Sequence, residues 1–194
     1  GAGLNIAQGV EKVEPDTTCF AFVGDSTFFA SAITGVVNAV YNQANMVLVV
    51  LDNSTTAMTG HQPHPGTGRT VMGEIVQKIN IEQVLRGIGV TEIETINPLE
   101  LEASVSCVKR MAEKSGVRAI IFKAPCIAVT KPKAPLHVDQ DSCIGCKKCI
   151  RDLGCPAIVM NDGKICIDAS MCTGCHLCSQ VCPVCAIAGG DDHE

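Results

Sequence analysis

The first two thirds of the chain alternate between short apolar segments and longer segments with apolar residues at helical spacing. The apolar segments have the length and composition of strands buried in a parallel sheet. We predict strands at residues 19–24, 46–51, 92–96 and 117–123. We predict helices over residues 31–43, 73–85 and 99–114. Strands that alternate with helices indicate a doubly wound α/β sheet.

One connection in this pattern is too long to be an ordinary turn. Residues 54–70 follow the second predicted strand and are rich in Gly, Pro, His and Thr. Loops of this length in compact domains are usually functional.

A domain boundary is expected near residue 131. The segment 131–135 reads Lys-Pro-Lys-Ala-Pro, and prolines among lysines are typical of a stiff, solvated linker. Beyond it the composition changes abruptly to Cys and Gly. We therefore expect an α/β domain over 1–130, a linker over 131–137 and a small second domain over 138–194.

The composition narrows the class of protein. Of the 194 residues, 46% are hydrophobic and 18% are charged, which favours a packed core over disorder. A net charge of −5 argues against a nucleic-acid partner. No apolar run approaches the roughly 20 residues of a membrane span, and the N-terminus does not resemble a signal peptide. We expect a cytoplasmic protein in a reducing compartment.

Ten of the 13 cysteines fall between Cys143 and Cys185, and eight of them form two similar runs. Each run has three cysteines two residues apart and a fourth before a proline. In two-cluster ferredoxins, the fourth cysteine of each run binds the other run's [4Fe–4S] cluster. On that pattern, the first cluster is held by Cys143, Cys146, Cys149 and Cys182. The second is held by Cys172, Cys175, Cys178 and Cys155.

We therefore expect the second domain to be a small α+β bacterial-type 2[4Fe–4S] ferredoxin domain that folds around its clusters. Zinc sites or disulfides would not explain a doubled pattern with trailing Cys-Pro pairs. The first run departs from the pattern, because five residues separate Cys149 from Cys155. Cys166 and Cys185 fall outside it, and we expect both to be small buried residues.

Polar residues follow the first two predicted strands. Gly24-Asp25-Ser26 ends the first and Asp52-Asn53 the second. Because the carboxyl ends of parallel strands share one edge of a sheet, oxygens of Asp25 and Asn53 can converge on a hard cation. Oxygen ligands with few charges suit Mg²⁺ that bridges a pyrophosphate, and Gly24 permits a close backbone approach.

A strand-to-helix turn with an N-cap would also explain Gly-Asp-Ser alone. Together with Asp-Asn 25 residues later, it resembles the thiamine diphosphate signature of GDG followed by NN. The resemblance implies thiamine diphosphate and Mg²⁺ as cofactors. It also implies that Asp25, Asn53 and the backbone carbonyl of Thr55 are the metal ligands, with Gly24 and Ser26 beside the cofactor.

The sequence around both motifs is similar to the alpha subunit of indolepyruvate:ferredoxin oxidoreductases. The two segments are Gly-Asp-Ser-Thr-Phe-Phe and Asp-Asn-Ser-Thr-Thr-Ala-Met-Thr-Gly-His-Gln-Pro-His-Pro-Gly. That family implies oxidative decarboxylation of a 2-oxo acid to an acyl-CoA, with electrons leaving through the clusters to ferredoxin. It implies a beta- or gamma-type partner subunit, coenzyme A and a 2-oxo acid as partners. The loop with Thr59 and Gly60 would border the cofactor, while His61 and His64 are more often structural in such loops.

Two alternatives stay open. The chain can be a ferredoxin-like electron-transfer subunit with a docking α/β domain. It can also act on another 2-oxo acid, such as pyruvate or 2-oxoglutarate; Met58-Thr59-Gly60-His61-Gln62 in place of Asn-Thr-Gly-Gly-Gln weighs against pyruvate. The glutamate that activates thiamine is expected on another domain, so no catalytic residue is assigned here and we expect the chain to be inactive alone.

Overall fold

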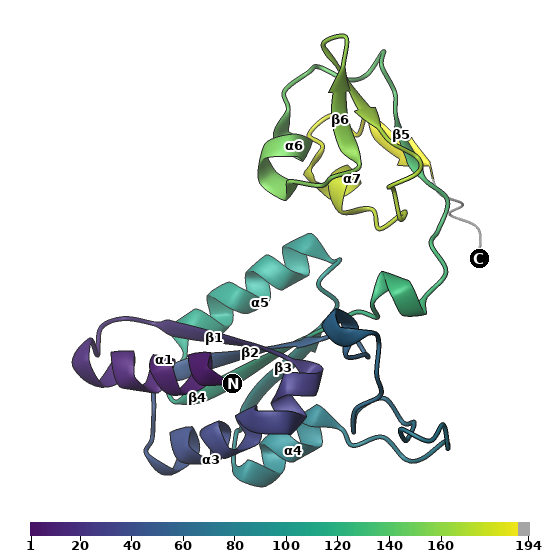
Figure 1. Cartoon of the computed structure of the whole chain (residues 1–194). Helices are drawn as coiled ribbons and strands as arrows, with labels where there is room; N and C mark the ends of the chain where they lie inside the picture. The colour runs from purple at the N-terminus through teal and green to yellow at the C-terminus, as the bar shows by residue number, and fades with distance from the viewer. Residues whose placement is uncertain (190–194) are drawn as a thin grey trace. The chain divides into compact units, whose positions relative to one another are not determined.

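A computed structural model describes residues 1–189 of the chain. They fall into two compact units, residues 1–129 and the part from residue 130 onward (Figure 1). The second unit includes strand β5 (Leu136–Val138), so pairing begins inside the segment that the sequence marks as a linker.

The first unit is built on a four-stranded parallel sheet with the strand order β1-β2-β4-β3. Its strands are β1 (Cys19–Gly24), β2 (Met46–Asp52), β3 (Glu92–Ile96) and β4 (Val117–Lys123). Its helices are α1 (Ala2–Val13), α2 (Asp25–Thr27), α3 (Ile33–Tyr41), α4 (Ile81–Ile88) and α5 (Leu101–Glu113). The predicted α/β fold and all four predicted strands are confirmed.

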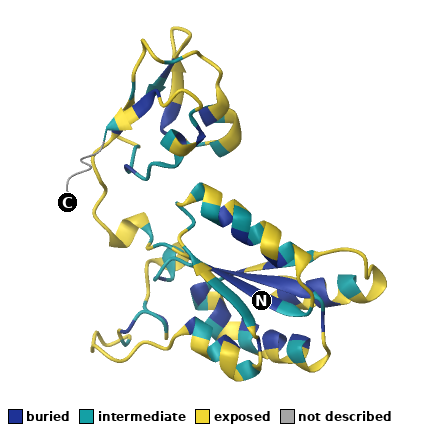
Figure 2. Cartoon of the chain, turned by 180° about the vertical axis from the view of Figure 1, so that it is seen from behind, coloured by how far each residue is buried: buried dark blue, intermediate teal, exposed yellow. Residues whose placement is uncertain are grey.

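Helices cover both faces of this sheet, as Figure 1 shows. Leu48 and Val50 of β2 pack with α1, α3 and α4 in one core, while Val49 packs with Cys107 and Met111 of α5 in the other. Strand β2 is therefore buried on both sides, which explains its unbroken run of apolar residues (Figure 2).

The predicted helix over residues 73–85 is wrong in its first half, because α4 begins only at Ile81. Asn80 caps the helix, and its side-chain oxygen accepts a hydrogen bond from the N–H of Gln83 at 3.0 Å. Upstream, Gly73 has φ +93° in a tight turn. Ile75 and Ile79 are exposed, so the apolar spacing that indicated a helix does not face a core.

The helix after β1 begins earlier than predicted, directly at Asp25. It runs from α2 through a π-helical turn, Phe28–Ala32, into α3. The wider π turn accommodates the fully buried Phe28, and such turns occur frequently at functional sites. Asp25 is thereby fixed at the junction of strand and helix.

Strand β1 forms one edge of the sheet. Among the described residues it pairs only with β2. Phe22 points to the face covered by α5 but lies beyond that cover, with 63% of its surface exposed.

The second unit consists of two small antiparallel sheets and two short helices. Strand β5 pairs with β8, and β6 pairs with β7. Their bounds are β6 (Ile158–Asn161), β7 (Lys164–Ile167), β8 (Ile187–Gly189), α6 (Lys148–Leu153) and α7 (Leu177–Val181). No helix within residues 1–189 is long and apolar enough to cross a membrane.

Candidate functional site

Asp25 is the most buried carboxylate at the carboxyl edge of the parallel sheet, with 2% of its surface exposed. Its Oδ1 accepts a hydrogen bond from the N–H of Ser26 at 2.8 Å. Burial raises the pKa of Asp25, and the Ser26 N–H and the nearby His64 oppose this rise. The carboxylate is thus held rigidly in a site that penalises its charge.

His64, from the long loop, reaches back to this carboxylate. Its Nδ1 accepts a hydrogen bond from the N–H of Gly66 at 3.2 Å, so a neutral ring carries its proton on Nε2. Nε2 lies 3.1 Å from Oδ2 of Asp25, but the two atoms are not aligned for a hydrogen bond. The contact links residues 39 positions apart, and no motif in the sequence pointed to it.

Asp25 Oδ2 is therefore a buried carboxylate oxygen without a hydrogen-bond partner. A buried, unpaired charged oxygen is strongly unfavourable unless a counter-charge compensates it. A divalent cation at this point would supply that charge, so the observed geometry fits the Mg²⁺ ion that the thiamine signature implies.

The end of β2 lies beside Asp25. Gly24 is paired with Leu51 in the parallel register, which brings Asp52 and Asn53 to the same edge of the sheet. Ser54, with φ +61°, turns the chain sharply after the strand. Asn53 Oδ1 accepts a hydrogen bond from the N–H of Thr55 at 3.2 Å, which fixes the amide oxygen in place.

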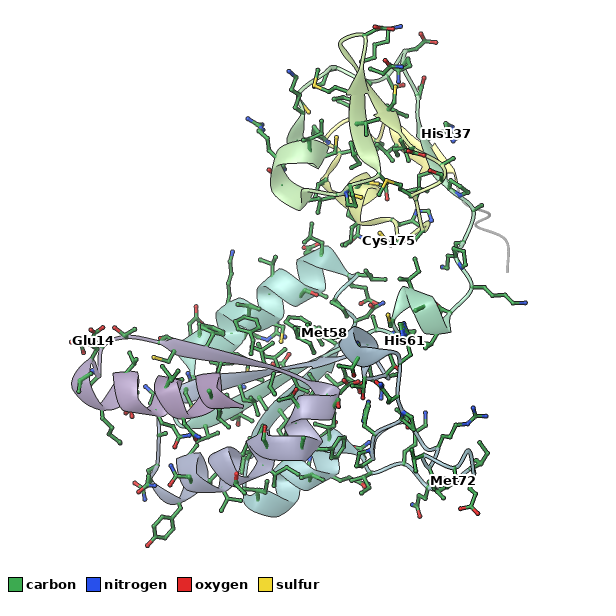
Figure 3. All side chains as sticks on the ribbon, viewed as in Figure 1. Glu14, Met58, His61, Met72, His137 and Cys175 are labelled. Atoms are coloured by element: carbon green, nitrogen blue, oxygen red, sulfur yellow. The ribbon has the colours of Figure 1, made fainter. Side chains whose placement is uncertain are left out.

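Two further candidate residues lie in the long loop after β2. Thr59 and Gly60 belong to a short 3₁₀ turn, Ala57–Thr59, and its exposed continuation. The Thr59 hydroxyl donates a hydrogen bond to Oε1 of Gln62 at 2.7 Å. Figure 3 shows Met58 and His61 together on this turn.

A polar cavity of about 360 Å³ opens at the same edge of the sheet. Its walls include Asp52 at the end of β2, Lys123 at the end of β4, and His64. Lys123 Nζ lies 3.5 Å from Asp52 Oδ2. Crevices at the carboxyl ends of strands are where open α/β sheets bind their ligands.

In the second unit, the cysteines of the first predicted set surround a small apolar cavity. The cavity is lined by Cys143, Cys146, Cys149 and Cys182. The N–H of Ala186 donates to the Cys182 sulfur at 3.3 Å, the kind of bond that stabilises a cluster thiolate. Burial raises the pKa of Cys149, since the pocket is shielded from water.

The second predicted set is also brought together. Burial raises the pKa of the Cys178 thiol to about 11. Its sulfur is near enough to those of Cys175, Cys155 and Cys172 for their charges to act in the same direction. The N–H of Leu136 donates to Cys172 Sγ at 3.4 Å.

All 13 cysteines are free thiols. Among residues 1–189, no three His, Cys, Asp or Glu side chains close on a single metal ion. That result is compatible with a cubane, because its four irons lie at separate corners and the thiolates are spread around it rather than directed at one centre. The two groups of four thus fit the clusters that the spacing predicts.

The expectation for Cys185 was wrong. It is exposed and has φ +51°, because the chain turns sharply after Cys182-Pro183. Cys166 is only partly buried, in β7.

Comparison with known proteins matches each part of the chain to a family. Residues 1–122 match the family described as "Thiamine pyrophosphate enzyme, C-terminal TPP binding domain". The chain belongs to the thiamine pyrophosphate enzyme family. Residues 136–183 match a second family, described as "4Fe-4S dicluster domain".

The resemblance to indolepyruvate oxidoreductases is confirmed by curated relatives. The chain is 46% identical over 169 residues to the indolepyruvate oxidoreductase subunit IorA of Methanothermobacter thermautotrophicus, covering 86% of this chain and 27% of that protein. It is 38% identical over 193 residues to IorA of Archaeoglobus fulgidus, covering 96% of this chain and 31% of that protein. The chain thus spans about a third or less of these relatives.

Among solved structures, the 2-oxoglutarate:ferredoxin oxidoreductase from Magnetococcus marinus is similar in fold. The TM-score is 0.59 at 20% sequence identity, over 66% of this chain and 46% of that one. At this level of identity, the likeness concerns the fold alone.

Proposed function

We propose that this chain is part of a thiamine diphosphate-dependent 2-oxo acid:ferredoxin oxidoreductase of the indolepyruvate type. The proposed reaction oxidatively decarboxylates the 2-oxo acid to an acyl-CoA. Its electrons leave through two [4Fe–4S] clusters to ferredoxin. A companion subunit, coenzyme A and an aryl-substituted 2-oxo acid are the expected partners.

The observation that carries the proposal is the buried, unpartnered Oδ2 of Asp25. It lies at the end of β1, beside the end of β2 that carries Asn53, in a chain that also groups eight cysteines. The α/β unit has a site that needs a cation, and the second unit has cysteines that fit electron carriers. The two units therefore suit two stages of one redox reaction.

In this proposal, side-chain oxygens of Asp25 and Asn53 and the carbonyl of Thr55 hold Mg²⁺. The bound thiamine diphosphate would supply the electron sink for loss of CO₂. His64 keeps the Asp25 carboxylate in position, because its Nε2 lies 3.1 Å from Oδ2 and its ring is itself buried. The grouped cysteines hold the clusters that remove electrons one at a time.

The test is to purify the chain anaerobically with its companion subunit and to titrate it with thiamine diphosphate and Mg²⁺. We compare the parent with Asp25→Asn and with Asp16→Asn, an exposed aspartate that serves as the matched control. Asp25→Asn should weaken cofactor binding at least tenfold, since it removes the buried charge, and both variants should retain their iron.

Equal cofactor affinity in the parent and Asp25→Asn would contradict the proposed metal site. No thiamine binding by any form would favour an electron-transfer protein. Reduction of a viologen dye with a panel of 2-oxo acids then identifies the substrate; a preference for pyruvate over aryl pyruvates would contradict the indolepyruvate type.

A further inference from the structure

The two cysteine runs have nearly the same backbone, so each serves as a comparison for the other. Gly145 in the first and Gly174 in the second have φ values of +65° and +68°. Lys147 and His176, which precede α6 and α7, have φ values of +60° and +61°. Side-chain differences between the runs therefore stand at equivalent positions of one repeated loop and helix.

The runs differ sharply in charge. The first carries three exposed cations, Lys147, Lys148 and Arg151. The equivalent residues of the second are His176, Leu177 and Gln180. Among the carboxylates of residues 1–189, only Asp152 lies near one of these cations: Lys148 Nζ is 3.9 Å from Asp152 Oδ2, and both side chains are well exposed.

The runs also differ in what covers them. The N–H of Lys133 donates to the carbonyl of Thr173 at 3.2 Å, so the segment before β5 lies across the second run. Gly174 is buried there, and a Cβ at this position would lie 2.7 Å from the Ala134 carbonyl oxygen. Nothing lies within 4 Å of the same point at Gly145.

The open first run presents an apolar centre inside its ring of cations. Ile144, between two of the cysteines, has 66% of its surface exposed. Cys146 is exposed as well, so the route from the cavity of the first set to solvent is short. At the second run the residue equivalent to Ile144 is the partly buried Thr173.

We propose that the surface formed by Ile144, Lys147, Lys148 and Arg151 is the docking site for an acidic one-electron carrier protein. This inference rests on the proposed function and adds the point of electron exit. At this surface one electron passes from the reduced cluster of the first set to the oxidised carrier, and no bond is made or broken. The three cations steer the carrier and orient it, and Ile144 forms a small dry centre, as suits a transient contact.

The test uses the full chain, reduced with dithionite and mixed with a [2Fe–2S] ferredoxin of acidic sequence. The docking variant is Lys147→Gln with Lys148→Gln and Arg151→Gln. The control removes the same charge from three other exposed lysines of the chain, Lys109, Lys131 and Lys164. Two quantities are measured at low and at physiological salt: the second-order rate constant of electron transfer, and the Kd for the oxidised carrier by calorimetry.

The docking variant should lose tenfold or more in rate constant at low salt, together with most of its salt dependence. A comparable weakening of Kd is expected. Steered association exceeds unsteered association by about two orders of magnitude or more, and salt removes this advantage. The control should change less than about twofold. Reduction of a small viologen dye should be equal in all three proteins.

Equal losses in the docking variant and the control would mean that only net charge matters, which would overturn the proposal. Unchanged rate and Kd in the docking variant would also overturn it. If that variant loses iron, the same rate constant and Kd are measured for the double variant Lys147→Gln with Lys148→Gln. The double variant keeps the Arg151 contact to the Cys146 carbonyl. Dithionite replaces the 2-oxo acid, so failure here is separate from failure of the thiamine site.

Discussion

Alanine at Gly174 should destabilise the second cysteine run far more than alanine at Gly145 destabilises the first. Both glycines have the left-handed conformation, which costs an alanine about 1–2 kcal/mol. Only Gly174 adds a collision, since its Cβ would lie 2.7 Å from both the Ala134 carbonyl oxygen and the Lys133 Cβ. The Ala134 oxygen belongs to the backbone, and the Lys133 N–H next to it is held by a hydrogen bond to the Thr173 carbonyl, so the segment cannot easily move away.

Overpacking of this kind adds about 1–3 kcal/mol. The expected total is roughly 2–5 kcal/mol for Gly174→Ala, against about 1–2 kcal/mol for Gly145→Ala. Gly163→Ala, in the turn between β6 and β7, is the matched control, with φ +78° and nothing within 4 Å of its added Cβ. It reports the conformational penalty alone, away from the cysteines.

The assay is anaerobic release of iron to a chelator, followed as iron remaining per chain. With two four-iron clusters expected, about half of the iron of Gly174→Ala should leave roughly fivefold to a hundredfold faster than the iron of Gly145→Ala, which corresponds to the added 1–3 kcal/mol. Gly145→Ala should behave like the Gly163→Ala control. If Gly145→Ala and Gly174→Ala release iron at the same rate, the covering segment does not stabilise the second run, and the reasoning is refuted.

Two further changes test the α/β unit through urea unfolding. Asn80→Ala should lower the free energy of unfolding by about 1 kcal/mol, because it removes the N-cap of α4; an unchanged value would contradict the observed start of that helix. Arg110→Gln should lower it only slightly at pH 7, since Arg110 is exposed and its partner Glu94 is partly exposed, so water screens the ion pair. The Arg110 hydrogen bond lowers the pKa of Glu94, so this stabilisation is present above the ordinary glutamate pKa and is lost as the pH falls through the lowered one. A difference that persists when Glu94 is protonated would exclude the ion pair as its cause.

The sheet could be predicted from sequence because a strand buried on both faces must be apolar throughout. That condition holds for the buried residues 46–50 of β2, at the centre of the sheet. Strand β4 is also central but carries the buried Arg118, whose guanidinium donates hydrogen bonds to the side chain of Asn45 and the carbonyl of Gly116. The start of α4 could not be predicted from sequence, because the apolar residues before it are exposed although they follow helical spacing. Local periodicity records spacing but not whether a core lies opposite it.

Some features of the candidate sites could be predicted from sequence, and others could not. The cysteine groups follow from spacing, since a cubane needs thiolates from a short loop and one from farther away. The convergence of Asp25 and Asn53 follows from parallel strands. The contact of His64 with Asp25 could not be predicted, because a long irregular loop with several glycines and prolines has too many possible paths.

The exposed edge of β1 has a consequence for handling the protein. An unpaired strand edge is a template for pairing with another chain, and natural proteins usually protect it with charges, prolines or a covering element. Residues 19–24 contain no charge and no proline, and Phe22 adds exposed apolar surface. This strand is thus the point from which aggregation of the isolated chain would begin, and solubility during expression depends on what lies against it.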